Sequence, residues 1–134
     1  MGSSTSDDAL WTGSGGSLKG VRVLVVEDDF LILMELEAIL GEAGAETAGC
    51  SSVRDALALA ETNGLAAAVL DVRLGRETVA PVARELARRG IPFVFYTGQF
   101  DTDAMRAEWP GRLFVPKPSQ PRTIVNAVAD LLHH

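Results

Sequence analysis

Residues 21–29 read Val-Arg-Val-Leu-Val-Val-Glu-Asp-Asp, an apolar, largely β-branched run that stops at three carboxylates. A run of this length and composition is typical of a strand that is buried on both faces of a sheet. Residues 30–41 follow as a mostly apolar segment that closes at Gly41 and Gly44, which indicates a helix with a glycine-rich end. A strand that leads directly into a helix is the repeating unit of an α/β protein.

The same alternation continues to the end of the chain. Apolar runs predict strands at about 45–49, 66–70, 91–96 and 112–115, and helices are predicted around 53–60, 79–86, 101–108 and 124–132. Five strands that alternate with five helices predict a parallel sheet with helices on both faces. Ligands of such folds bind beyond the carboxyl ends of the strands, so the functional residues are expected there.

Composition restricts the function further. The 134 residues include 12 basic and 18 acidic side chains, a formal net charge of −6, and a single cysteine. One cysteine excludes an internal disulfide framework and a cysteine-based zinc site. The acidic balance, without a concentrated basic stripe, argues against direct nucleic-acid binding, and no apolar run approaches the length of a membrane span. We expect a cytoplasmic chain of one domain, 21–134, preceded by a flexible Gly/Ser-rich tail at 1–20.

Polar side chains stand where the predicted strands end: Glu27, Asp28 and Asp29 after the first, Asp71 after the third, Thr97 after the fourth and Lys117 after the fifth. Each one alone has an ordinary structural explanation. An aspartate after a strand commonly caps the next helix or forms a turn, Thr97 precedes a turn glycine, and Lys117 between two prolines fits an exposed loop. Their shared position at one edge of the sheet favours a common site.

The chemistry of this set is that of a cation site beside an anion site. Clustered carboxylates repel one another unless a counter-ion is present, and oxygen ligands with room for water suit Mg²⁺. Lys117 and the Thr97 hydroxyl offer partners for the oxygens of an anionic ligand. An aspartate can also act as the nucleophile that becomes an acyl phosphate.

From about Val21 to Leu132 the chain resembles the receiver domain of bacterial two-component response regulators, the CheY-like fold. The resemblance rests on four elements in order, whose key positions are separated by 43, 26 and 20 in the numbering: Val25-Val26-Glu27-Asp28, Val69-Leu70-Asp71, Tyr96-Thr97-Gly98 and Val115-Pro116-Lys117-Pro118. It implies a three-layer, doubly wound α/β fold with a five-stranded parallel sheet in the order 2-1-3-4-5. It also implies phosphorelay signalling rather than independent enzymatic turnover.

The resemblance implies a role for each matching residue. Asp71 is the phospho-acceptor, Asp28 binds Mg²⁺ directly, and Glu27 binds it through water or completes the acidic pocket. The backbone carbonyl of Arg73 supplies a further metal ligand. The phosphoryl donor is a sensor histidine kinase or a phosphotransfer protein.

A second group of residues is implied to sense the modification. Thr97 and Lys117 bind phosphoryl oxygens, and Lys117-Pro118 is a cis peptide. Phe114 stands at the switch-aromatic position, although plain core packing explains it as well. Phosphorylation is implied to shift the population of conformations of a surface built from residues 101–132, which a downstream protein partner binds. Slow self-dephosphorylation is expected, modulated by Arg73 and Gln99.

The chain departs from the family pattern in two places. Most receivers follow the acceptor with a Pro-Gly-x-Asp-Gly-like loop, whereas here Val72-Arg73-Leu74-Gly75-Arg76-Glu77-Thr78 follows. Its two arginines either reach the acidic pocket or remain solvated. Phe95-Tyr96-Thr97-Gly98 is similar to the Phe-x-Thr-Gly ending of an atypical, partly stand-alone receiver subgroup, in which the usual switch movement need not apply.

Two other function classes remain open at this point. A receiver-like interaction module that is never phosphorylated would keep the fold and lose the chemistry. An aspartyl phosphohydrolase needs a second acid two residues after its nucleophile, and Arg73 occupies that position. Nucleotide-binding glycine motifs are disfavoured, because the glycines at 13–20 precede the first strand instead of following it.

Overall fold

The computed structural model describes residues 17–98 and 102–133 and contains one five-stranded parallel sheet in the order β2-β1-β3-β6-β7. The strands are β1 (Arg22–Val26), β2 (Glu46–Cys50), β3 (Leu65–Leu70), β6 (Phe93–Thr97) and β7 (Phe114–Pro116). Counted among these five alone, the order is 2-1-3-4-5, which confirms the predicted topology.

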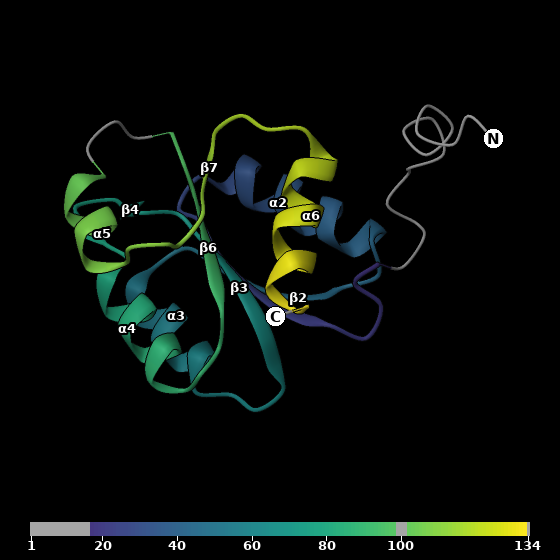
Figure 1. Ribbon diagram of the computed structural model, residues 1–134, viewed down its shortest axis with the longest axis horizontal. Helices are drawn as coiled ribbons and strands as arrows, with labels where there is room; N and C mark the ends of the chain where they lie inside the picture. Colours follow the sequence, from purple (N-terminus) through teal and green to yellow (C-terminus); the bar gives the residue numbers. More distant parts are fainter. Residues whose placement is uncertain (1–16, 99–101, 134) are drawn as a thin grey trace.

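Helices cover both faces of the sheet, so the molecule has three layers (Figure 1). Helices α2 (Phe30–Glu42) and α6 (Pro121–Leu131) pack together on one face. Helices α3 (Val53–Ala60), α4 (Ala80–Arg88) and the short α5 (Asp103–Glu108) lie on the other. No helix in the described ranges has the length and apolarity needed to cross a membrane.

The core consists of two apolar layers, because successive side chains of a strand point to opposite faces. In β1, Leu24 and Val26 belong to the layer under α3 and α4, whereas Val23 and Val25 belong to the layer under α2 and α6. All four are fully buried. Their burial on both faces explains why the strand is apolar throughout and why polar residues appear only after it ends.

Asp29 is the residue that caps α2. Its carboxylate accepts hydrogen bonds from the backbone N–H groups of Leu31 and Ile32, at 3.0 and 3.1 Å. This is the ordinary role that the sequence allowed for either aspartate after β1. Because Asp29 performs it, the neighbouring Asp28 carboxylate is available for other contacts.

The packed domain includes part of the segment that we expected to be tail. Leu18 is fully buried in the α2–α6 layer, and its backbone N–H donates to the carbonyl of Ala43 at 2.8 Å. Several predicted boundaries also move: the last strand runs from Phe114 to Pro116 instead of 112–115, α6 begins at Pro121 instead of 124, and α5 begins at Asp103 within the described residues.

The segment after Asp71 forms a small antiparallel hairpin that we did not predict. Strand β4 (Arg73–Leu74) pairs with β5 (Glu77–Thr78), with Gly75 and Arg76 as the connecting loop. Gly75 has a φ of +65°. The substituted loop is therefore an ordered element at the carboxyl edge of the sheet, and it follows the acceptor position directly.

Candidate functional site

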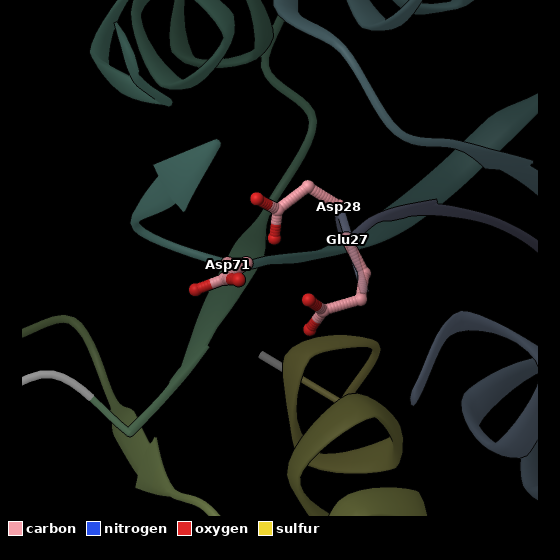
Figure 2. A group of neighbouring side chains, drawn as sticks. All are labelled: Glu27, Asp28 and Asp71. Atoms are coloured by element: carbon pink, nitrogen blue, oxygen red, sulfur yellow. The ribbon is translucent and has the colours of Figure 1, made fainter. Parts of the chain in front are cut away.

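Three carboxylates meet at the carboxyl edge of the sheet (Figure 2). Glu27 and Asp28 directly follow β1, and Asp71 directly follows β3, which pairs with β1. One carboxylate oxygen from each lies within 4.8 Å of the others. The parallel pairing of the two central strands therefore brings together residues that are more than forty positions apart in the chain.

Lys117 connects two of these carboxylates. It follows β7, and its Nζ lies 2.6 Å from Oε1 of Glu27 and 3.1 Å from Oδ2 of Asp71. Its peptide bond to Pro118 is cis, as the resemblance implied. The ammonium reaches the cluster from the edge of the sheet and neutralises part of its negative charge.

The site has a strongly perturbed electrostatic environment. Glu27 is 1% exposed, and this burial raises its pKa to about 7 against the opposing effect of its hydrogen bond from Lys117. For Lys117, burial acts to lower the pKa, but the hydrogen bond to Glu27 and the charge of Asp71 outweigh it and the pKa is raised. The lysine is therefore a stable cation at neutral pH. Glu27, in contrast, gains or loses its proton close to neutral pH.

Backbone N–H groups complete the partners of the three carboxylates. Asp29 donates to Oε2 of Glu27 at 3.0 Å, Arg73 donates to Oδ1 of Asp71 at 3.4 Å, and Gly75 donates to Oδ2 of Asp28 at 2.9 Å. Hydrogen bonds of this kind stabilise the ionised form of a carboxylate. Two of the three donors belong to the unpredicted segment after Asp71.

Thr97 and Tyr96 end β6 beside this cluster. Thr97 is 6% exposed, and its carbonyl accepts a hydrogen bond from the backbone N–H of Lys117 at 3.1 Å. The Nζ of Lys117 lies 5.5 Å from the centre of the Tyr96 ring, within range of a cation–π contact. The ends of β6 and β7 thus hold the threonine and the lysine next to each other.

Phe114 begins β7, and its ring contacts both Phe95 and Arg106. Its ring stacks on the fully buried Phe95, with centroids 4.6 Å apart, and the guanidinium carbon of Arg106 lies 4.1 Å from the ring centre. The ring is half-buried, so this conformation has the packing role that the sequence also allowed.

Arg73 and Gln99 are the two residues expected to modulate self-dephosphorylation. The Arg73 side chain is exposed beside the acceptor, and Gln99 lies outside the described residues.

The sequence did not predict Gly75 as a site residue. The signal that points to it is the pair Gly75-Arg76, since a glycine that opens a two-residue loop is a hairpin signature.

The donor set suits a hard divalent cation. The cluster offers carboxylate oxygens from Glu27, Asp28 and Asp71, and it contains neither sulfur nor imidazole. Oxygen ligands of this type, few enough to leave positions for water, match the coordination of Mg²⁺. One ammonium against three carboxylates also leaves negative charge for a cation to neutralise.

Comparison with known proteins identifies the family of the chain. Residues 23–129 match the model of the response regulator receiver domain, which is most of the chain. The chain belongs to this family. Receiver domains are generally phospho-acceptors without independent enzymatic activity, bind Mg²⁺ in an acidic pocket, and interact with histidine kinases or phosphotransfer proteins in two-component signalling.

Individual relatives agree with the family. The receiver is 28% identical over 120 residues to the uncharacterized transcriptional regulatory protein YbdJ of Bacillus subtilis strain 168, and the match covers 87% of this chain and 53% of YbdJ. The chain therefore spans about half the length of that curated relative. The solution structure of SdrG from Sphingomonas melonis Fr1 is 40% identical, with a TM-score of 0.73, and the match covers 84% of this receiver and 96% of SdrG. A response regulator receiver protein from Sinorhizobium medicae WSM419 is 26% identical, with a TM-score of 0.74 and coverage of 87% and 97%.

Proposed function

We propose that this receiver accepts a phosphoryl group on Asp71 from the phosphohistidine of a sensor kinase or phosphotransfer protein, in a Mg²⁺-dependent reaction. The observation that carries the proposal is the position of Asp71. Its carboxylate lies beside two further carboxylates and is held by Lys117 at 3.1 Å. We place the reaction in the cytoplasm, where ATP is available to charge the donor histidine.

The transfer is a substitution at phosphorus. A carboxylate oxygen of Asp71 forms a bond to phosphorus while the phosphorus–nitrogen bond to the donor imidazole breaks, and the electron pair of that bond returns to the ring nitrogen. Charge neutralisation and positioning supply most of the catalysis in such a transfer. The receiver would contribute both, because Asp71 lies beside the carboxylates of Glu27 and Asp28 and accepts a hydrogen bond from Lys117.

Glu27, Asp28 and Asp71, together with the carbonyl of Arg73, would hold Mg²⁺. The cation would supply charge neutralisation for the transferred phosphoryl oxygens. Asp28 is suited to direct contact, because its carboxylate is exposed and is not used as the helix cap. Glu27 is buried against Lys117, which suits it to a water-mediated contact or to completion of the pocket.

Lys117 and Thr97 would receive the phosphoryl group. Lys117 already donates to Oδ2 of Asp71, so its ammonium can pass to a phosphoryl oxygen with little movement. Thr97 ends β6 next to it, and its hydroxyl would donate to another oxygen. A phosphoryl group adds negative charge and strong acceptors, and local contacts of this kind bias a two-state surface.

In this proposal, phosphorylation changes the conformation of a surface built from residues 101–132, and a downstream protein binds that surface. Phe114 belongs to this surface and lies on β7, which pairs with β6 where Thr97 stands, and its ring contacts Arg106 of α5. A switch movement of the Phe114 ring would break its contacts with Phe95 and Arg106. Arg73 and Gln99 would set the access of water to the acyl phosphate, and so its lifetime.

The proposal is tested by incubating the chain with phosphoramidate and following intact mass. We expect one added phosphoryl group when Mg²⁺ is present, its removal by hydroxylamine, and no addition in Asp71→Asn. Asp55→Asn is the matched control, because Asp55 is an exposed aspartate in α3. No adduct on the wild-type chain would favour an interaction module that is never phosphorylated, and steady phosphate release from unrelated monoesters would favour a hydrolase.

A further inference from the structure

The β4–β5 hairpin is held firmly at its base. The backbone N–H of Val79 donates to the carbonyl of Val72 at 2.9 Å, which closes the segment into a loop. The side chain of Leu74 is 5% exposed and packs in the same core layer as Val72. A segment fixed by a backbone bond and an apolar anchor positions its tip reproducibly.

The tip of the hairpin has the conformation that only glycine adopts easily. Leu74 pairs with Glu77, so Gly75 and Arg76 form a two-residue loop. Gly75 has a positive φ of +65°, whereas Arg76 does not have a positive φ. This is the pattern of a type II′ turn, in which glycine occupies the first central position. The turn directs the N–H of Gly75 away from the hairpin.

That N–H donates to Oδ2 of Asp28 at 2.9 Å, across 47 residues of sequence. Asp28 is exposed, and an exposed aspartate samples several rotamers unless a hydrogen bond selects one. The contact is charge-assisted, and it joins the hairpin to a carboxylate of the acidic cluster. The same hairpin also donates from Arg73 to Asp71.

We infer that the backbone N–H of Gly75 positions Asp28 for the divalent cation, so that cation affinity depends on the hairpin turn. This rests on the proposed function for the identity of the cation. Some groups hydrogen-bond to a metal ligand without contacting the metal. Loss of such a group typically lowers metal affinity ten- to a hundredfold. Gly75 is therefore a positioning residue, which acts through Asp28 and does not touch the cation.

The test measures Mg²⁺ affinity by calorimetry in wild-type, Gly75→Ala and Gly90→Ala chains. A Cβ at either glycine meets nothing within 4 Å, and Gly90 has a φ of +73°, so both substitutions act on the backbone alone. Gly90 precedes β6 at the opposite end of the sheet. We expect affinity to fall about tenfold in Gly75→Ala and to stay at the wild-type value in Gly90→Ala. Equal affinities in all three chains would overturn the inference.

A second measurement does not need the variant at residue 75 to fold. Hydrogen exchange of the Gly75 amide in the metal-free chain is expected to be slow in wild type and fast in Asp28→Ala, while the Val79 amide, bonded to Val72, stays protected in both. Equal exchange of Gly75 in the two chains would overturn the inference without affecting the proposed function. Absence of Mg²⁺ binding by the wild-type chain would overturn both.

Discussion

The two sides of the acidic cluster are built in different ways. On one side, Glu27, Asp71 and Lys117 follow strands of the central sheet, are largely buried, and contact one another through side chains. On the other side, the β4–β5 hairpin is mostly exposed and contacts the carboxylates through the backbone N–H groups of Arg73 and Gly75. The first arrangement depends on side-chain identity, whereas the second depends on backbone shape.

This difference suggests a division of function. Groups fixed by the sheet supply the charges that the transfer needs, because their positions follow from strand pairing. Groups on the hairpin adjust the orientation and surroundings of those charges. Substitutions on the strand side are therefore expected to slow the reaction strongly or to abolish it. Substitutions on the hairpin side are expected to change the cation affinity or the lifetime of the acyl phosphate.

Lys117→Ala is expected to have the largest effect. It removes the only cation that the described residues place on Glu27 and Asp71, and so the charge that would stabilise the transferred phosphoryl group. Loss of one preorganised stabilising group typically costs roughly a hundredfold or more in rate. The initial rate of Asp71 phosphorylation by phosphoramidate measures it, with the exposed Lys19→Ala as control. A wild-type rate in Lys117→Ala would contradict the proposed division of function between the strand side and the hairpin side.

Glu27 is expected to make the metal-free chain less stable as pH rises. Its pKa is about 7 in the folded chain against an ordinary value of 4.5, so the folded state binds more protons than the unfolded state between these values. The free energy of unfolding should fall by about 3 kcal/mol from pH 4.5 to above 7 and then level off.

Urea denaturation with a chelator at pH 5 and pH 8 checks this prediction. Glu27→Gln should remove most of the difference between the two pH values, because the amide does not titrate. The exposed Glu42→Gln is the control and should behave like wild type. A wild-type chain with the same pH dependence as Glu27→Gln would refute the assignment of this titration to Glu27.

Arg73→Ala is expected to have the smallest effect of the three. The side chain is exposed, so the free energy of unfolding should change by about 0.5 kcal/mol or less. The half-life of the acyl phosphate, followed by intact mass after the donor is removed, should change several-fold instead. An unchanged half-life would remove Arg73 from the groups that control access of water.

Much of the strand side could be predicted from sequence. A fully buried strand such as Val23–Val26 must be apolar, so the polar residues that end it mark the carboxyl edge of the sheet. The same reasoning leads to Asp71 and Lys117, which the structure brings into contact. The resemblance to receiver domains added the role that we propose for each of them.

The hairpin side could not be predicted in the same way. Strands β4 and β5 have two residues each, too few for any hydrophobic period, and Leu74 alone anchors them in the core. Leu18 was missed for a similar reason, because a single leucine among glycines and serines gives no pattern. Both depend on long-range contacts, to Asp28 and to Ala43, that local sequence does not encode.

The most direct test of the account locates the modified residue. The chain is treated with phosphoramidate in Mg²⁺ or in chelator, the acyl phosphate is reduced with borohydride, and the peptides are sequenced by tandem mass spectrometry. We predict homoserine at position 71 in the Mg²⁺ sample and unmodified aspartate there in the chelated one. Reduction at Glu27 or Asp28 instead, or equal reduction at position 71 without the cation, would contradict the account.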